Sequence, residues 1–206
     1  MKICIFGATG RVGSQLMKLA LQDLHDVTVL VRDQNKVVEK HNNLYIVEGN
    51  VLQENDVKKA LKGADIVLSA LGTDGNRTLS HSIPTIIKHM DKEGINRIIT
   101  IGTAGILQAR TNQKIYRFQS EESKRKTTTA AEDHLSAYVA LKNSELCWTI
   151  VCPTHLIDGE ETGMYRTEGE MLPLDGSKIT VGDTARFTWS LINKKVYENT
   201  RVGIAY

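Results

Sequence analysis

This 206-residue chain has few cysteines and almost no excess of one charge over the other, and each of these features argues against a class of protein. The three cysteines, Cys4, Cys147 and Cys152, form no CxxC or Cys/His ligand set, so we expect reduced core residues and no metal site. The formal net charge is only +2. The densest basic run, residues 124–126, follows two glutamates, which is typical of a solvated loop. We therefore expect no nucleic-acid partner.

Long apolar stretches and internal repeats are missing as well. A membrane-spanning helix needs about 18 or more apolar residues in succession, and the opening MKICIFGATG has only a short apolar run before glycine interrupts it. We expect no secretory signal and no membrane partner, and hence a cytoplasmic protein. With 41% hydrophobic and 24% charged residues, the composition is that of one compact domain over residues 1–206.

Short β-branched runs alternate with longer segments of helical period. This alternation predicts an α/β fold of βαβ units, in which strands apolar on both faces form a doubly wound parallel sheet between helices. The expected strands are 2–6, 27–31, 44–49, 65–71, 97–103, 148–153 and 200–205. The expected helices are 11–24, 54–62, 78–93, 129–143 and 182–193, of which the fourth has Thr129 and Glu132 at capping-box spacing and the last opens at Gly182-Asp183.

Two segments are too long to be ordinary connections. They follow the fifth and sixth expected strands, at about 104–127 and 154–177. Open α/β sheets bind ligands beyond the carboxyl ends of their strands. We therefore predict that both segments form the rim of a substrate site within a single domain.

The first expected strand runs directly into GATGRVG, a GxxGxxG pattern that opens a helix. Gly7, Gly10 and Gly13 would permit a tight turn and a close approach of the backbone to a pyrophosphate, whose charge the helix N–H groups stabilise. The pattern predicts a dinucleotide-binding turn. The alternative is a strand-to-helix turn whose glycines occur there by chance.

The second expected strand ends in Arg32-Asp33. An NAD site usually places a carboxylate at this strand end to accept hydrogen bonds from the ribose. Arg32 instead suits a 2′-phosphate, with Arg11 as a second positive charge, so NADPH is favoured over NADH. In the alternative, Arg32 is simply exposed and Asp33 contacts the ribose.

Two later strand ends border the same predicted groove. Asn50 and Val51 follow the third strand and are candidates to flank an adenine. The segment Leu71–Thr73 follows the fourth strand and would pass beneath the ribose and pyrophosphate. Ordinary turns are the alternative for both segments.

Seven stretches together carry a resemblance to a known family: GATGRVG, VTVLVRD, GNVLQENDV, LGT, AEDH, WTIVCP and TGMY. They resemble the NmrA-like group of atypical short-chain dehydrogenases/reductases, and within it flavin and biliverdin-IXβ reductases. The resemblance implies a Rossmann-like domain that binds NADP(H) and stacks a flavin or tetrapyrrole on the nicotinamide. By position it implies cofactor contacts from Gly7, Thr9, Gly10, Arg11, Val12, Gly13, Arg32, Asn50, Val51, Leu71, Gly72 and Thr73, with Asn50 replacing the usual aspartate.

The same resemblance implies that Thr103, His134 and His155 lie at the nicotinamide and act on the substrate. Ordinary short-chain dehydrogenases use a tyrosine and a lysine one helical turn apart for proton transfer. Tyr138 and Lys142 have that spacing, but they come close before the sixth strand, and we interpret the spacing as coincidence. Each histidine has the alternative of an ordinary surface or packing role.

Without a phenol–ammonium pair, hydride transfer to a conjugated acceptor is favoured over alcohol–carbonyl chemistry. The sequence thus predicts an NADPH-dependent reductase of a flavin, a biliverdin-like tetrapyrrole, a quinone or a similar small molecule, acting as a monomer or weak dimer. A non-catalytic NmrA-like redox sensor that binds NADP(H) is one alternative. An atypical sugar-nucleotide epimerase or dehydratase is another.

Overall fold

The computed structural model describes residues 1–123, 125 and 127–206, and its centre is one eight-stranded sheet. The strand order is β3-β2-β1-β4-β5-β6-β10-β8, and every pairing is parallel except that of β8 with β10. The predicted α/β doubly wound, single-domain fold is confirmed, with one antiparallel strand at an edge as the correction. The strands are β1 Lys2–Phe6, β2 Asp26–Val31, β3 Leu44–Glu48, β4 Ile66–Ser69, β5 Arg97–Ile101, β6 Cys147–Pro153, β8 Arg166–Gly169 and β10 Thr200–Ala205.

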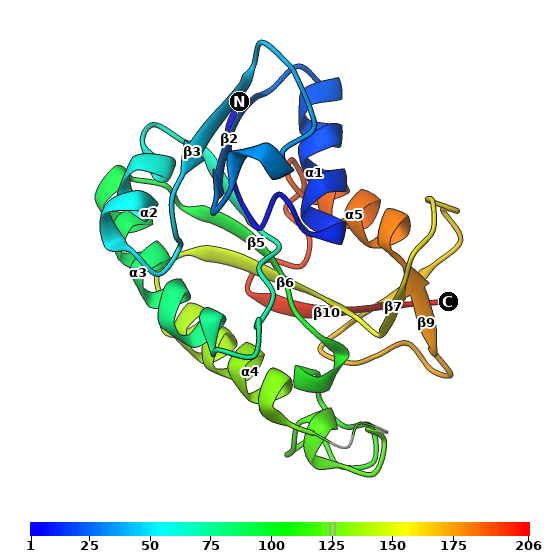
Figure 1. Ribbon diagram of the computed structural model, residues 1–206. Helices are drawn as coiled ribbons and strands as arrows, with labels where there is room; N and C mark the ends of the chain where they lie inside the picture. The colour runs from blue at the N-terminus through cyan, green and yellow to red at the C-terminus, as the bar shows by residue number, and fades with distance from the viewer. Residues whose placement is uncertain (124, 126) are drawn as a thin grey trace.

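Helices cover both faces of the sheet (Figure 1). On one face lie α1 (Arg11–Gln22) and α5 (Val181–Ser190), which pack against each other. On the other lie α2 (Glu54–Leu61), α3 (Thr78–Glu93) and α4 (Thr129–Lys142). Each face has its own buried apolar cluster, because the strands are apolar on both sides.

One buried carboxylate ties two of these helices together. Asp133 on α4 is only 3% exposed, and its two oxygens accept hydrogen bonds from the backbone N–H groups of Leu79 (3.1 Å) and Ser80 (2.8 Å). Those N–H groups belong to the first turn of α3, where they have no partner within the helix. A carboxylate there also complements the helix dipole, so Asp133 fixes α4 against the start of α3.

One predicted helix cap and one predicted helix start are corrected. Helix α4 begins at Thr129 as expected, but its N-cap is Thr128, which adopts a helical conformation and donates its hydroxyl to Glu132 (2.7 Å) instead of capping the backbone. Helix α5 begins at Val181, one residue before the expected start. Its cap is Thr180, whose hydroxyl accepts a hydrogen bond from the N–H of Asp183 (3.1 Å).

The predicted rim segment 154–177 contains regular structure in addition to loops. Strand β7 (His155–Ile157) pairs with β9 (Lys178–Thr180) in a small parallel sheet, and β8 joins the main sheet. The other rim segment contains two 3₁₀ turns, Ala104–Ile106 and Arg117–Gln119, and a third such turn covers Gln34–Lys36. Strand β8 reads RTEG and is polar, while β7 and β9 have only three residues each, so no strand pattern marks them in the sequence.

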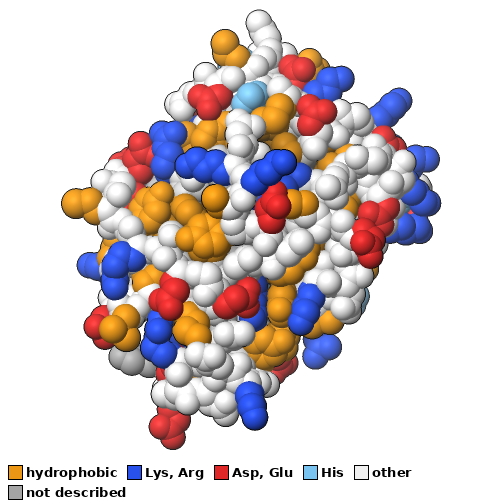
Figure 2. Space-filling view, turned by 180° about the vertical axis from the view of Figure 1, so that it is seen from behind, with side chains coloured by type: hydrophobic (Ala, Val, Ile, Leu, Met, Phe, Trp, Pro, Cys, Tyr) orange, Lys and Arg blue, Asp and Glu red, His pale blue; other side chains and the backbone are white. Residues whose placement is uncertain are grey.

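Cys4 and Cys152 are buried as expected, whereas Cys147 at the start of β6 is only half-buried. Charges of both signs are interspersed over the face shown in Figure 2. Of the basic run, Lys124 and Lys126 lie outside the described residues, so its predicted role as a solvated loop stays a prediction. No described helix is both long and apolar enough to cross a membrane.

Candidate functional site

Two positions at the junction of β1 and α1 admit only glycine, one in the turn and one in the first turn of the helix. Gly7 has a φ of +79°, and a Cβ atom added to it would lie 2.5 Å from the backbone oxygen of Ala70. A Cβ atom on Gly13 would lie 2.1 Å from the backbone oxygen of Gly7. These distances are too short for any side chain, so the glycines let the turn, the following helix and the end of β4 pack together.

The N-terminus of α1 has Gly10 as its N-cap. Among the described residues no side chain caps the first turn by a hydrogen bond, and the turn contains no acidic residue. The N–H groups at this helix start are therefore available to an anion, whose charge the helix dipole favours. A dinucleotide pyrophosphate fits this chemistry and this close-packed glycine turn.

An open groove of about 550 Å³ starts at this turn and crosses the carboxyl ends of β1, β4, β5 and β6. It brings together nine residues that the sequence singled out: Gly10, Arg11, Val12, Leu71, Gly72, Thr73, Thr103, His134 and His155. The other predicted cofactor residues do not line it; these are Gly7, Thr9, Gly13, Arg32, Asn50 and Val51. The groove therefore gathers the predicted nicotinamide and pyrophosphate residues, and it stops short of the predicted adenosine end.

At that adenosine end, the predicted side chains are bonded to other residues of the chain. The Arg32 guanidinium pairs with Asp74 at 3.1 Å, and both side chains are exposed. Asp33 accepts two hydrogen bonds from Asn35 and so caps a 3₁₀ turn, which disfavours the alternative that it contacts a ribose. The side-chain oxygen of Asn50 accepts from the N–H of Leu52, in an Asx turn.

Arg11, which is predicted to lie beside a 2′-phosphate, is bonded to other residues of the chain. Its guanidinium donates to the carbonyl of Leu156 at 3.3 Å and to Asp158 at 3.2 Å. The side chain thus joins the glycine turn to the segment that contains β7. That Arg11 assists Arg32 beside a 2′-phosphate stays a prediction.

A second cavity, of about 490 Å³, opens beside the groove between the two rim segments. Residues from both segments line it, including Arg117, Phe118 and Asp175. Five residues border both the cavity and the groove: Thr103, Arg125, Pro153, Thr154 and His155. A molecule in the cavity would therefore lie against the nicotinamide end of a dinucleotide held in the groove.

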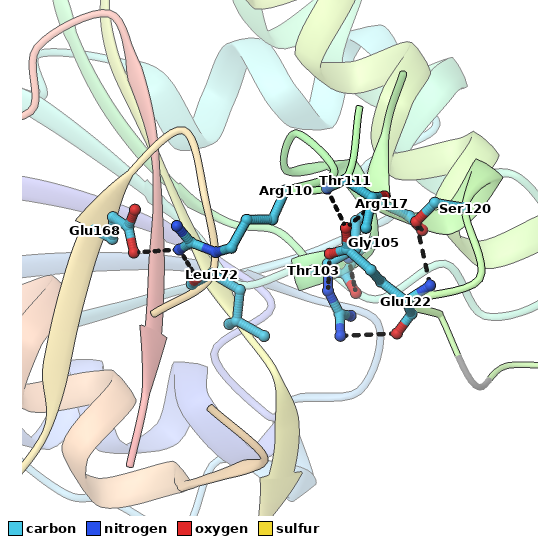
Figure 3. A network of polar contacts seen from close by, with 9 residues as sticks. All are labelled: Thr103, Gly105, Arg110, Thr111, Arg117, Ser120, Glu122, Glu168 and Leu172. Carbon is cyan, nitrogen blue, oxygen red and sulfur yellow. Dashed lines mark hydrogen bonds and ion pairs between the residues drawn. The ribbon is translucent and has the colours of Figure 1, made fainter. Parts of the chain in front are cut away.

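Polar contacts hold the outer wall of this cavity in place (Figure 3). Glu122 accepts from the N–H and the hydroxyl of Thr111, at 2.9 and 3.0 Å, and Arg117 donates to the carbonyl of Glu122 at 2.9 Å. Burial raises the pKa of the Glu122 carboxyl, but the bonds from Thr111, the backbone of Arg110 and the charge of Arg117 together leave that pKa below its ordinary value. Arg110 reaches across to Glu168 and to the carbonyl of Leu172, which links the two rim segments.

Arg201 is a second anchor of the rim, and the sequence reasoning missed it. Its side chain is 3% exposed and pairs with Glu170 while donating to the carbonyl of Ile106. Its guanidinium lies 4.2 Å from the ring centroid of Tyr138 and 5.4 Å from that of Tyr116. A lone arginine in the apolar strand TRVGIA is the signal that could have identified it.

The three candidate substrate residues differ in their surroundings. Thr103 is half-buried, and its hydroxyl accepts from the N–H of Gly105 at 3.4 Å. His134 is half-buried, and burial lowers its pKa to about 4, with Arg125 lowering and Asp133 raising it. His134 is therefore neutral at neutral pH. His155 is exposed at the first position of β7.

Tyr138 and Lys142 lie outside both the groove and the cavity. Tyr138 is 6% exposed, packs edge-on against Trp148, and lines a separate hollow with Lys142 and Arg201. Because both residues lie away from the groove and the cavity, we expect Tyr138→Phe and Lys142→Ala to leave kcat for any hydride transfer within about twofold. Loss of a residue that transfers a proton in the reaction would cost about 10²–10⁴-fold. Steady-state NADPH oxidation would measure both variants. A thousandfold loss in either would show that this pair transfers a proton to the substrate.

Three kinds of comparison show which known proteins this chain is similar to. The profile of a family described as NAD(P)H-binding matches residues 7–195. An uncharacterized protein, YwnB of Bacillus subtilis, is 27% identical over 81% of this chain and 78% of its own length. The structure also superposes on a provisionally named NADH-flavin reductase from Streptococcus pneumoniae (TM-score 0.84, 24% identity, 100% and 99% of the two chains). A similar superposition is found for the anaerobillin reductase ChuY from Escherichia coli O157:H7 (TM-score 0.84, 22% identity, 100% and 97% of the two chains).

Proposed function

Because the chain belongs to the NAD(P)H-binding family, we propose that it is an NADPH-dependent reductase that transfers hydride to a flavin, a biliverdin-like tetrapyrrole, a quinone or a similar conjugated acceptor. One observation carries this proposal. The groove that begins at the glycine turn shares five lining residues with the cavity between the rim segments. Hydride transfer needs the donor and acceptor rings in contact, and this shared wall is where two rings would meet.

In this proposal the chain binds and positions, while bound NADPH is the source of hydride. The first-turn N–H groups of α1 hold the pyrophosphate, and the Arg32 guanidinium binds the 2′-phosphate. The Thr103 hydroxyl orients the nicotinamide carboxamide or donates to the acceptor. Since His134 is neutral at neutral pH, the reduced product takes its proton from water, which the open groove admits.

The names of the structural neighbours support the reductase class. One is provisionally named an NADH-flavin reductase and the other is named an anaerobillin reductase. The residues at the groove agree with such chemistry in one respect. By the family resemblance, the tyrosine and lysine of ordinary short-chain dehydrogenases would stand at Ala130 and His134, which line the groove. Neither residue of that pair is therefore present there.

The test is NADPH oxidation, followed at 340 nm, with FMN, FAD, biliverdin and a quinone offered separately. We expect steady turnover with at least one of these acceptors. Tight NADPH binding without turnover would instead select the NmrA-like redox sensor, which also needs no tyrosine–lysine pair. Conversion of a sugar nucleotide without net NADPH oxidation would select an epimerase or dehydratase.

Thr103 and His134 give a further expected result. Thr103→Ala should lower kcat/KM by about tenfold, because the nicotinamide or the acceptor is then misplaced, and His134→Ala should act more weakly. The pH–rate profile of the unmodified protein should show no limb near pH 6.5, since His134 stays neutral until the pH falls to about 4.

Thr103→Ser, which keeps the hydroxyl, is the matched control and should retain most of the activity. An acidic optimum that disappears in His134→Ala would identify His134 as an obligatory proton donor and contradict this assignment.

A further inference from the structure

We infer that Asp74 is a specificity-determining residue whose carboxylate competes with the cofactor's 2′-phosphate for the Arg32 guanidinium. This inference rests on the proposed binding of NADPH. The pair that carries it joins Arg32, which directly follows β2, to Asp74, which lies shortly after β4, at 3.1 Å. No local sequence pattern connects the two residues.

The Arg32–Asp74 pair lies at the carboxyl end of the central strands, where a dinucleotide would cross the sheet. Strand β1 lies between β2 and β4, so a bond between residues that follow β2 and β4 passes over the carboxyl end of β1. The glycine turn leaves β1 at that end. A dinucleotide that runs from an adenosine site at β2 to a nicotinamide site at β5 must cross the same place.

The shape of the groove agrees with this position. Asp74 lines the groove and Arg32 does not, and the groove ends on the side where the two side chains meet. The pair thus separates the open nicotinamide half from the residues predicted to hold adenosine. A 2′-phosphate can reach the Arg32 guanidinium only by replacing the Asp74 carboxylate, or by sharing the guanidinium with it.

The turn that contains Asp74 has an unusual backbone. Asp74, Gly75 and Arg77 have φ values of 48°, 68° and 53°, so these three residues are in the left-handed region. Aspartate and asparagine tolerate this conformation better than most residues. Asp74→Asn therefore removes the charge while keeping the side-chain shape and the turn.

The expected outcome follows from charge. A phosphate that binds Arg32 in the unmodified protein must either break the ion pair or share the guanidinium beside a second negative group, whereas a cofactor with a free 2′-hydroxyl does neither. Asp74→Asn should thus tighten binding of NADPH by about three- to tenfold and change NADH binding by less than about twofold. Asp74 would lower the preference for NADPH without abolishing it.

The experiment measures binding without turnover. Dissociation constants of adenosine 2′,5′-bisphosphate and of 5′-AMP are measured by calorimetry, since these two ligands differ at the 2′ position. The variants are Asp74→Asn, Arg32→Ala and the double variant. Glu39→Gln is the control, because Glu39 makes a partly exposed ion pair with Lys18 (3.5 Å) and its loss changes the net charge equally.

The inference holds if Asp74→Asn tightens the binding of adenosine 2′,5′-bisphosphate but not that of 5′-AMP. The effect should also be larger in the protein with Arg32 than in the Arg32→Ala background. It is overturned if the two ligands respond alike, or if Glu39→Gln has the same effect. A separate result tests the proposed cofactor: if unmodified protein binds both ligands equally, the assignment of Arg32 to the 2′-phosphate fails, whatever Asp74 does.

Discussion

Arg201→Met should lower the free energy of unfolding by about 3 kcal/mol, the lower end of the range for removing one partner of a buried ion pair. The arginine is 3% exposed, whereas its partner Glu170 has a side chain that is 33% exposed and can turn partly to water. The substitution also deprives the carbonyl of Ile106 of its donor and the ring of Tyr138 of its cation. Urea unfolding of both proteins measures the difference.

Two further variants test the cause of that loss. Arg201→Met combined with Glu170→Gln should regain part of the stability, because part of the cost is the carboxylate of Glu170 left without its partner. Lys18→Met breaks the partly exposed pair with Glu39 and should cost less than about 1 kcal/mol. Equal effects of Arg201→Met and Lys18→Met would contradict the view that Arg201 anchors the rim.

Arg32→Ala should weaken binding of NADPH by about 10- to 150-fold, which corresponds to the 1.5–3 kcal/mol typical of a hydrogen bond to a charged group. Arg32 is the residue at the end of β2 where an NAD site usually has a carboxylate, and its side chain is 75% exposed. Fluorescence titration with NADPH and NADH measures both affinities in both proteins.

NADH binding should change by less than about twofold in Arg32→Ala, because NADH has no 2′-phosphate. Arg32→Lys should fall between the two proteins, since an ammonium keeps the charge but cannot pair bidentately with a phosphate. Equal affinities for NADPH and NADH in the unmodified protein would remove the basis for the predicted preference.

The main sheet was predictable because its strands carry strong local signals. Runs such as KICIF and WTIVCP are apolar on both faces, and the glycines after the first run fix where the first helix begins. The location of the groove followed from the same signals, since the carboxyl ends of parallel strands share one edge. Thr103, His134 and His155 do come together there, while their chemical roles stay predictions.

The parts that sequence could not supply are contacts between distant segments. Strand β8 reads RTEG and has no apolar alternation, so only its pairing with β10 makes it a strand. The bond from Arg11 to Asp158 depends on where β7 folds back over the glycine turn. Asp74 resembled any polar turn residue until the sheet order placed it opposite Arg32.

The place of β10 in the sheet also sets an order of events during synthesis. Residues 200–205 come after β8 in the chain but lie between β6 and β8, and among the described residues β8 pairs with no other strand. While the ribosome still holds residues 200–205, the strand at 166–169 has nothing to pair with. The glycine turn and its neighbouring strands β1, β2 and β4 precede both segments in the chain, so their pairing does not have to wait for residues 200–205.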